Sequence, residues 1–447
     1  MIINCKNKTF DFNIDAPPSK SIYHRELIVR FLLMTSGEGA ASDTSDTLPN
    51  DLEVLPRDNE DIRATKSVLS ALYTASGYDT QSVDSSSENV YLPCNESGST
   101  LRFMIPVAAA YMFGIGRKNH DETKLIFETK GRLFDRPLDE LEAALKPHGI
   151  NIEKDASSRS IIVTGEMTPG DYTIDGSVSS QYISGLLMAL TLFDEPCSVN
   201  VTGEMKSVHY IDLTLDVLKK YGCESDFKGG TFYPKTGGYH ASAEAFKASN
   251  KKSILENFKV EGDWSNGAFL LCMEKWSDIK VGNLNPDSRQ GDRAILDYLK
   301  LVNEIRDGEV TDTDLTWNCS DIPDITPYMA TVAPFVFDKI TFTGVARLRI
   351  KESDRVKAVR EQLAEVGVKT EETEDTLTVY RYCNDSNNSS SLPDQKNIRL
   401  SSYNDHRMAM CAILLAMILK TEIELDDISC IKKSFPEFLE YIEKYYA

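Results

Sequence analysis

Basic side chains at the starts of apolar helical runs are the strongest chemical signal in this sequence. The first turn of a helix presents unpaired backbone N–H groups and the positive end of the helix dipole, and both favour a bound anion. Lys adds a compact charge there, and Arg adds a fork that fits carboxylate or phosphate. The basic residues at such positions are Lys20, Arg25, Arg102, Arg132, Arg136, Lys351, Arg355, Arg407 and Lys433. Together they predict a site that holds more than one anionic group.

Serine hydroxyl groups and two carboxylates lie in the same segments. The serines are Ser21, Ser99, Ser179, Ser180 and Ser207. Asp324 lies in an Ile-Pro-Asp turn before a helical run, and Glu352 directly follows Lys351. Either carboxylate would transfer protons beside cations, but Asp324 would equally cap its helix and Glu352 would equally offset a helix dipole. The sequence leaves these interpretations open, as it does capping by Ser179 and Ser180.

Other mechanisms lack their motifs. The sequence contains no G-x-x-x-x-G-K-[ST] loop, no G-x-S-x-G elbow and no H-E-x-x-H pair. The nine cysteines are scattered without a CxxC pair, so we expect neither a zinc site nor a disulfide framework.

The charge balance excludes broad classes of partner. Lys and Arg number 49 against 69 Asp and Glu, which gives a formal net charge of -20. Such an acidic surface disfavours nucleic acid and anionic membranes. Because there is also no run of about 20 apolar residues and no signal-peptide pattern, we expect a cytoplasmic protein.

A repeated pattern organises the chain. Six times, a short polar segment leads into an apolar helical run, and a second, more amphipathic helix and short β-type runs accompany it. The six segments begin at Pro18, Asn95, Ser177, Gly262, Ile322 and Asn404. This predicts six α/β units, three to a domain, although an ordinary α/β protein would also show recurring helices by chance.

Ten motifs in order resemble those of the 5-enolpyruvylshikimate-3-phosphate synthase family of enolpyruvyl transferases. They span nearly the whole chain, and GSVSSQ and NDHRMAM are the most specific. The motifs are PPSKSIYHR (Pro17–Arg25), GSTLRF (Gly98–Phe103), RLFDRP (Arg132–Pro137), GSVSSQ (Gly176–Gln181), SVHYIDLTL (Ser207–Leu215), VEGDWS (Val260–Ser265), DIPD (Asp321–Asp324), RIKESDR (Arg349–Arg355), YNDHRMAM (Tyr403–Met410) and KKSFPEF (Lys432–Phe438).

The resemblance implies an α/β (α+β) fold of two similar domains. Each would contain three repeated α/β units in an inside-out, barrel-like arrangement, and two crossing strands would hinge the domains. Residues 21–250 would bind mainly shikimate-3-phosphate. Residues 1–20 and 251–447 would complete the phosphoenolpyruvate site and carry catalytic residues, in a cleft that closes on substrate.

The implied activity belongs to aromatic amino-acid and chorismate biosynthesis. The enolpyruvyl group of phosphoenolpyruvate is transferred to the 5-hydroxyl of shikimate-3-phosphate, and phosphate is released by addition and elimination through a tetrahedral intermediate. The family needs no metal or cofactor, and we expect a monomer whose partners are these two substrates.

Residue roles carry over by position. The implied shikimate-3-phosphate ligands are Lys20, Ser21, Arg25, Ser179, Ser180, Gln181, Ser207, Asp324 and Lys351. The implied phosphoenolpyruvate ligands are Lys20, Gly98, Arg136, Gln181, Arg355, Arg407 and Lys433. The implied catalytic residues are Asp324 as the base, Glu352 as the proton donor, Lys20 and Lys433, with His406 in support.

The sequence departs from the family pattern in three places, and two alternatives remain. The opening motif is Pro-Pro-Ser-Lys-Ser rather than Pro-Gly-Ser-Lys-Ser, which should alter the hinge backbone slightly. Glu96 and Arg347 stand where the family often has Asn, so their roles stay open. A related enzyme that transfers enolpyruvyl to a UDP-sugar carries an Arg-x-Gly-Cys loop, which this sequence lacks. A non-catalytic homologue that only binds anions would not need Asp324, Lys351, Glu352 or Lys433.

Overall fold

The chain divides into two compact units with separate hydrophobic cores. The computed structural model describes residues 1–36, 47–56, 58–76, 89–114, 123–248, 259–383 and 398–445. Unit 1 comprises Met1–Ser19 and Glu261–Ala447, and unit 2 comprises Lys20–Val260. The chain divides after Ser19 and after Val260. The sequence analysis placed these two divisions after residues 20 and 250.

The chain passes between the units twice, and the two passages pair with each other. The backbone N–H of Ser19 donates to Glu261 O (2.7 Å), and that of Asp263 donates to Pro17 O (2.7 Å). Pro18 and Gly262 form an antiparallel bridge between these bonds. The predicted pair of crossing strands is therefore present.

Three of the sheets in the described part of the chain are four-stranded and share one topology. Two parallel strands lie at one side, and an antiparallel hairpin pairs with the second of them. The first sheet contains β3 (Asn89–Asn95), β4 (Lys124–Thr129), β5 (Ile150–Asp155) and β6 (Ser160–Gly165). The second contains β7 (Asp171–Asp175), β8 (Ser198–Thr202), β9 (Asp226–Lys228) and β10 (Thr231–Tyr233). The third, in unit 1, contains β12 (Asp314–Asn318), β13 (Lys339–Thr343), β14 (Thr370–Glu372) and β15 (Thr376–Tyr380).

Two helices complete each of these βαβαββ units. Parallel strands need a crossover, which the first helix supplies, and the second helix leads into the hairpin. The pairs are α5 (Gly98–Ala109) with α6 (Asp139–Leu145), α7 (Ser180–Leu190) with α8 (Val208–Lys220), and α13 (Thr326–Val332) with α14 (Arg355–Glu365).

The three other predicted helix pairs are also present within the described ranges. Around them, β2 (Asn13–Asp15) runs parallel to β11 (Lys280–Gly282), β16 (Ile398–Leu400) runs parallel to β17 (Glu422–Leu425), and β1 (Ile2–Asn4) runs antiparallel to β17. The pairs are α1 (Lys20–Thr35) with α4 (Glu60–Ala75), α11 (Trp264–Glu274) with α12 (Ile295–Arg306), and α15 (His406–Leu419) with α16 (Phe438–Tyr445). The six-unit pattern of the sequence is thus confirmed. Unit 2 also contains α3 (Thr47–Leu52) and α9 (Gly238–Ala248).

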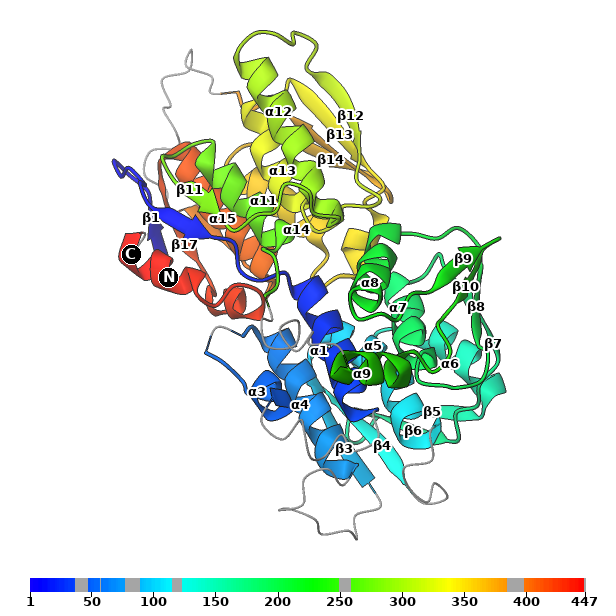
Figure 1. Ribbon diagram of the computed structural model, residues 1–447. Coiled ribbons are helices and arrows are strands. Elements are labelled where there is room, and N and C mark those ends of the chain that lie inside the picture. The colour runs from blue at the N-terminus through cyan, green and yellow to red at the C-terminus, as the bar shows by residue number, and fades with distance from the viewer. Residues whose placement is uncertain are drawn as a thin grey trace. The chain divides into compact units, whose positions relative to one another are not determined.

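The first helix of each pair lies in the interior of its unit, and the sheets lie outside (Figure 1). Helix α15 is buried continuously from His406 to Met417, whereas α12 buries only one face through Ile295, Tyr298, Leu299 and Val302. Helices α11, α13 and α15 contact one another in unit 1. The arrangement has helices inside and sheets outside, as predicted, but the described sheets do not join into a closed barrel.

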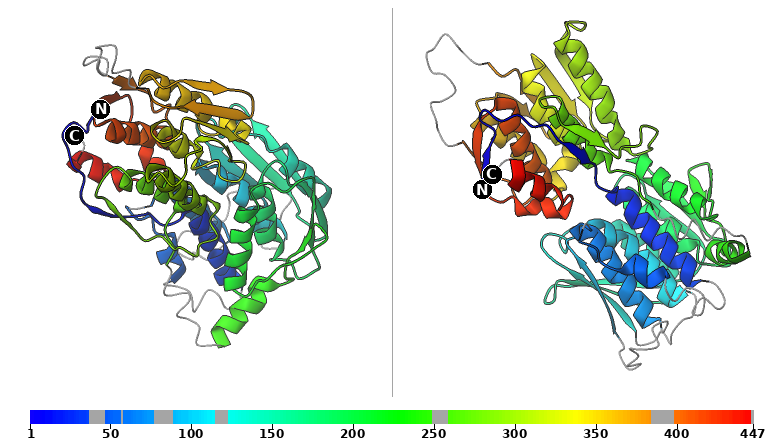
Figure 2. Two further views of the ribbon diagram at one scale, coloured as in Figure 1. Left: turned by 90° about the horizontal axis from the view of Figure 1, so that it is seen from above. Right: turned by 60° about the vertical axis from the view of Figure 1, so that its left-hand side comes forward.

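Both ends of the chain contribute to unit 1. The first strand and α16 lie near each other in both views (Figures 1 and 2). The rings of Phe12 and Tyr445 stack with centroids 4.5 Å apart, and Lys8 Nζ donates to Tyr445 O (3.2 Å). These contacts explain why a segment before unit 2 belongs to the same core as the last third of the chain.

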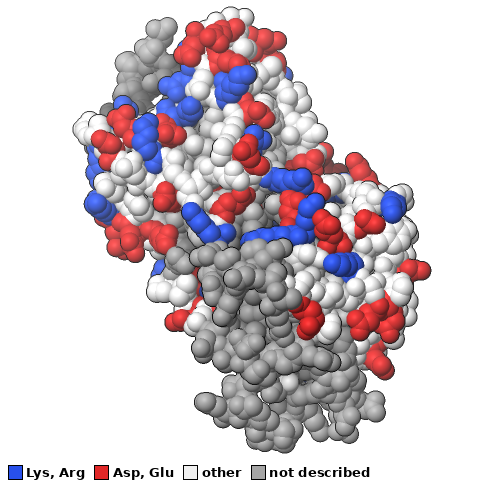
Figure 3. Space-filling view, in the orientation of Figure 1, with Lys and Arg blue, Asp and Glu red and all other residues white. Residues whose placement is uncertain are grey.

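The surface is acidic, as the composition requires. On the face shown in Figure 3, acidic side chains gather at the turn between α12 and β12, which carries the exposed residues Asp307, Glu309, Asp312 and Asp314. Within the described residues, the helices are too short or too polar to span a membrane.

The β5–β6 hairpin should be intolerant of a side chain at Gly165. This residue has φ +110°, and a Cβ atom there would lie 2.0 Å from the backbone oxygen of Gly149. We expect Gly165→Ala to lower the free energy of unfolding by at least about 2 kcal/mol through strain and overlap. Gly229→Ala is the control, because Gly229 has φ +59° with no atom within 4 Å of the added carbon, and it should cost only about 1 kcal/mol. Thermal unfolding of both variants measures the difference, and equal midpoints would contradict this reading of the hairpin.

Candidate active site

Asp324 is the centre of a charged cluster in unit 1. Its Oδ1 lies 2.8 Å from Arg355 Nη1, 3.4 Å from Arg407 Nε and 3.7 Å from Lys351 Nζ. These side chains come from the turn before α13, the first residue of α14, the first turn of α15 and the end of the 3-10 helix Ala346–Ile350. The polar helix starts that the sequence analysis singled out are therefore brought together in this unit.

Arg355 is held by carboxylates on several sides. Its Nε donates to Asp405 Oδ2 (2.8 Å) and its Nη2 to Asp405 Oδ1 (3.3 Å), in fork geometry. Asp405 is fully buried and also caps α15 by accepting from Arg407 N (3.0 Å). Arg355 already has Asp405 and Asp324 as partners. Its N–H groups therefore hold these carboxylates in position.

Arg407 differs from Arg355 although both begin helices. It is 4% exposed, and its Nη1 makes a long hydrogen bond to Tyr328 Oη (3.4 Å). Its Nε has no hydrogen-bond partner among the described residues, apart from the ion-pair contact with Asp324. A buried guanidinium with unfilled donors is costly, so this side chain suits a bound anion.

Lys351 is a half-buried cation among other cations. Burial lowers the pKa of its ammonium group to about 8, and the charges of Arg355, Arg347 and Arg407 act in the same direction, while Asp324 opposes them. Arg347, a departure from the family pattern, thus influences the site through its charge.

Asp292 brings a further carboxyl group to the cluster. It is 4% exposed, and burial raises its pKa to about 7, with Asp324 adding to the rise and Arg407 opposing it. Ser265 Oγ donates to its Oδ2. The sequence analysis did not identify Asp292.

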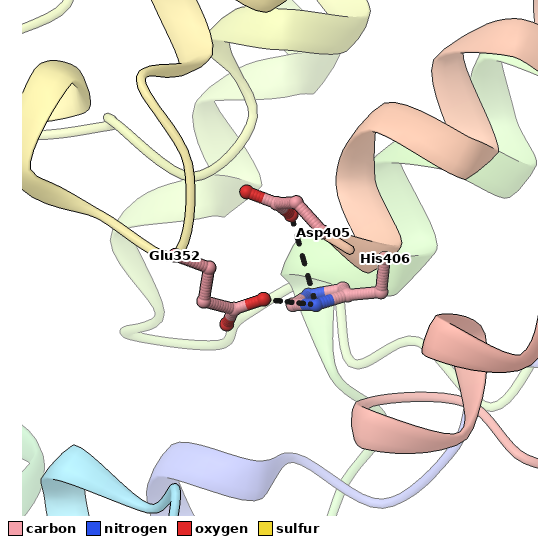
Figure 4. Close-up of side chains that lie close together, drawn as sticks. All are labelled: Glu352, Asp405 and His406. Atoms are coloured by element: carbon pink, nitrogen blue, oxygen red, sulfur yellow. Dashed lines mark hydrogen bonds and ion pairs between the residues drawn. The ribbon is translucent and has the colours of Figure 1, made fainter. Parts of the chain in front are cut away.

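Glu352 pairs with His406 beside this cluster (Figure 4). Glu352 Oε2 lies 3.0 Å from His406 Nδ1, and Asp405 Oδ1 lies 3.8 Å from the same nitrogen. These three residues are close enough to suggest a metal site. However, Arg355 Nη2 lies 3.9 Å from Glu352, and Arg355 forks onto Asp405. The carboxylates therefore already face a cation, and the group fits an anchor for Arg355 and His406 better than a metal centre.

Lys433 lies at the start of α15 rather than at a helix start of its own. It ends the 3-10 helix Ser429–Lys433, and its Nζ donates to Asn404 O (3.0 Å). Tyr403 and Asn404 both have φ +54°, a conformation that is strained for residues other than Gly. The backbone before α15 is therefore held in an unusual shape where Lys433, Asp405 and Arg407 meet.

In unit 2, Lys20 pairs with a carboxylate that the sequence analysis missed. Lys20 Nζ lies 2.8 Å from Asp61 Oδ2, and these residues stand at the starts of α1 and α4. Ser21 follows Lys20 in α1. Asp61 lies in the first turn of α4, where acidic residues are common. The sequence around it therefore gives no sign that it pairs with Lys20.

Arg25 is deeply buried and makes many internal hydrogen bonds. Its Nε donates to Thr214 Oγ1 (2.6 Å), and its Nη2 donates to Tyr210 O (2.8 Å). The guanidinium lies over the Phe103 ring. The structure thus places Arg25 as a link between α1 and α8.

The starts of α5 and α7 are joined by side chains. Gln181 Nε2 donates to Ser99 Oγ (2.9 Å), and Arg102 Nη1 donates to Gln181 Oε1 (3.0 Å). A Cβ atom at Gly98 would lie 2.6 Å from Arg136 Nη1. A guanidinium therefore lies against the first residue of α5, where a side chain would collide with it.

The predicted serine ligands occupy helix starts. Ser179 caps α7 by accepting from Gln181 N (3.3 Å), and Ser180 is the first residue of that helix. Ser207 precedes α8 with φ 54° and makes no capping hydrogen bond through its side chain. Glu96 lies against the backbone of Gly131, where an added Cβ atom would be 2.7 Å from its Oε1.

Comparisons with known proteins agree over nearly the full length. A 3-phosphoshikimate 1-carboxyvinyltransferase of Clostridium acetobutylicum is 30% identical over 443 residues, which cover 95% of this chain and 93% of that protein. Another from Clostridium beijerinckii is 31% identical, with 95% and 93% covered.

Solved structures share the fold. EPSP synthase from Acinetobacter baumannii has a TM-score of 0.62 at 16% identity and covers 100% of this chain and 98% of its own. The enolpyruvyl transferase NikO from Streptomyces tendae has a TM-score of 0.58 at 11% identity, with 99% and 96% covered. Residues 6–442 match the family EPSP synthase (3-phosphoshikimate 1-carboxyvinyltransferase), and the chain belongs to this family.

Proposed function

We propose that both units supply ligands for the two anionic substrates of the family's reaction. That reaction transfers the enolpyruvyl group of phosphoenolpyruvate to the 5-hydroxyl of shikimate-3-phosphate and releases phosphate, so the chain is an enolpyruvyl transferase of aromatic biosynthesis. The observation that carries the proposed roles is the buried guanidinium of Arg407, whose Nε has no hydrogen-bond partner among the described residues, beside Asp324 and Lys351.

Phosphoenolpyruvate is held mainly by cations. In unit 1 these are Arg407 and Lys433, with Arg355 keeping Asp324 and Glu352 in place. In unit 2 the proposed ligands are Lys20, Gly98, Arg136 and Gln181, because a guanidinium and an open helix start meet at Gly98. Fixed donors stabilise developing negative charge better than mobile ones.

Shikimate-3-phosphate is held mainly by hydroxyl groups of unit 2. Ser179, Ser180 and Gln181 begin α7, and Ser207 precedes α8. Helix starts bind phosphate through their backbone N–H groups. Lys20 and Ser21 complete this set. Arg25 helps to hold α8 in place by donating to Thr214 and Tyr210. Unit 1 contributes Lys351 and Asp324.

Asp324 accepts the 5-hydroxyl proton as the hydroxyl oxygen adds to phosphoenolpyruvate. Arg355, Lys351 and Arg407 hold its carboxylate in place. Glu352, oriented by His406, protonates the methylene carbon of phosphoenolpyruvate. In the elimination, the resulting methyl group loses a proton, the carbon–carbon double bond forms again, and the carbon–oxygen bond to phosphate breaks. Lys20 and Lys433 stabilise the negative charge of the tetrahedral intermediate and of the leaving phosphate.

The remaining parts of the proposal concern the whole molecule. Unit 2 binds mainly shikimate-3-phosphate, and unit 1 completes the phosphoenolpyruvate site and carries most of the catalytic groups. The enzyme works as a cytoplasmic monomer without a metal or cofactor. The motif set, the acidic surface and the charged groups already present at the site support these statements.

An acceptor assay tests the activity. Phosphate release from phosphoenolpyruvate, measured in a metal chelator, should require shikimate-3-phosphate and should not occur with a UDP-sugar. Release with the UDP-sugar would favour the related cell-wall activity. Binding of shikimate-3-phosphate without any release would show a non-catalytic binder.

Asp324→Asn should separate binding from turnover. The amide keeps the size of the side chain but cannot accept the proton, so kcat should fall by about 10²–10⁴-fold. Binding of shikimate-3-phosphate, measured by calorimetry, should change little. Asp314→Asn is the control, because Asp314 is an exposed carboxylate of unit 1 paired with Lys339. Turnover that survives in Asp324→Asn would mean that another group is the base.

Lys351 should set the alkaline limit of activity. Since burial lowers its pKa to about 8, the ammonium group is charged below that pH and loses its proton as pH rises through it. We expect kcat/KM to fall above pH 8, and we expect the fall in Lys351→Arg to move upward because Arg stays charged. The measurement is kcat/KM from pH 6 to 10. An unchanged alkaline limb in an active Lys351→Arg enzyme would assign that limb to another group.

A further inference from the structure

Four buried side chains form a continuous line of hydrogen bonds in unit 2. His24 Nδ1 lies 2.7 Å from Thr65 Oγ1, Thr65 Oγ1 lies 2.7 Å from Thr100 Oγ1, and Thr100 Oγ1 lies 2.7 Å from Ser97 Oγ. The line runs from α1 through α4 to the start of α5. The four residues are 0–1% exposed, so water cannot satisfy them.

Both ends of this line reach groups that the proposed function assigns to substrate. Ser97 caps α5 by accepting from Thr100 N (3.3 Å), and Gly98 is the next residue. Thr100 Oγ1 also donates to Asp61 O (3.4 Å), and the Asp61 carboxylate pairs with Lys20 (2.8 Å). The line therefore connects Lys20 with the phosphoenolpyruvate-binding start of α5.

The number of available protons fixes the direction of the line. Each hydroxyl group donates one hydrogen bond and accepts up to two. The Thr100 hydroxyl must donate to Asp61 O, because a carbonyl oxygen cannot donate. Thr100 then accepts from both Thr65 and Ser97, so Thr65 must in turn accept from His24. With this direction, every hydroxyl proton in the line has an acceptor.

This direction places the proton of His24 on Nδ1. The Nε2 atom is buried and has no hydrogen-bond partner among the described residues. The opposite tautomer would bury an unpaired N–H group, and an unpaired donor is the rarer and costlier arrangement in protein interiors. The hydrogen-bond geometry and the cost of burial thus select the same tautomer.

We propose that His24, as the neutral tautomer protonated on Nδ1, is a positioning residue that fixes Asp61, Lys20 and the start of α5 for substrate. This rests on the proposed function of Lys20 and Gly98. His24 does not contact substrate and acts through Thr65 and Thr100. Apolar side chains of similar shape would fill this interior at little cost, so the polar line is retained for the geometry that it imposes on its two ends.

The imidazole stays neutral at every pH at which the enzyme would work. Burial lowers the pKa of His24 to about 3, and the nearby charges of Lys20 and Arg25 lower it further against the opposing effect of Asp61. His24 is therefore a constant donor, and its removal should not alter the shape of the pH profile between pH 5 and 8.

Two substitutions of His24 separate the effect of the Nδ1–H donor from the effect of the size of the imidazole ring. Asn can place an N–H group near the position of Nδ1, whereas Gln places its amide near Nε2. We expect His24→Gln to raise the KM for phosphoenolpyruvate about tenfold or more, and His24→Asn to stay within about threefold of the unsubstituted enzyme. Equal losses in the two variants would overturn the assignment of the donor.

A double-mutant cycle tests whether the line acts as one unit. Thr65→Val removes the hydroxyl but keeps the shape, and the double variant His24→Gln/Thr65→Val should bind phosphoenolpyruvate no worse than the weaker single variant. Thr191→Val is the matched control, because the Thr191 hydroxyl is buried and donates to Leu187 O at the end of α7. It should lower the melting temperature and leave KM unchanged. If the His24 and Thr65 variants behave like this control, the line is only structural and the proposal is wrong.

A spectroscopic readout keeps the test independent of activity. In protein labelled with ¹⁵N-histidine, the signals that disappear in His24→Asn should show a protonated Nδ1 and an unprotonated Nε2 from pH 5 to 8. A protonated Nε2 would overturn the tautomer even if the enzyme were active. Absence of turnover in the unsubstituted chain, with this spectrum intact, would refute the proposed function and leave the hydrogen-bond line standing.

Discussion

The buried ion pair between Arg355 and Asp405 is the interaction on which the charged cluster of unit 1 depends. Asp405 caps α15 and accepts two hydrogen bonds from Arg355. Arg355 also donates to Asp324, which lies before α13. One guanidinium thus ties the starts of three helices together. Losing one partner of such a buried pair leaves a charge without compensation and costs about 3–5 kcal/mol. The positions of Asp324, Glu352 and Arg407 all follow from this single connection.

Unit 2 fixes its groups by a different physical means. Beside ion pairs such as Lys66 with Asp58, several of its connections near the helix starts are hydrogen bonds between neutral groups, such as the line from His24 to Ser97 and the bond between Gln181 and Ser99. Neutral groups cost less to bury than charges do. In this unit Arg102 donates to Gln181, and the guanidinium of Arg136 lies against Gly98.

Local sequence patterns predicted the helices well because each apolar run is long and the polar segment before it is distinct. They also identified the basic residues at helix starts. They could not identify Asp61, Asp292 or Asp405, because each looks locally like a helix cap or a first-turn acid, and its partner is distant in sequence. Nor could they tell that Arg25 and Arg355 spend their donors inside the protein. Packing between different repeats decides which charged side chains have a partner of opposite charge, and the sequence of a single repeat does not contain that information.

The contrast between Arg355 and Arg407 shows how an acidic chain can present positive charge at one place. Both side chains begin helices of the same core and both approach Asp324. Asp405 forks onto Arg355 and offsets its charge, so Arg355 behaves as part of the scaffold. Arg407 shares Asp324 with Arg355 and Lys351, makes a long contact to Tyr328, and also interacts through its charge with Asp292 and Asp263. Three cations converge on Asp324, while Asp405 and Glu352 also face Arg355 and Asp292 acts on Arg407. In the proposed function, an anionic substrate adds its charge beside Arg407, whose Nε has no hydrogen-bond partner among the described residues.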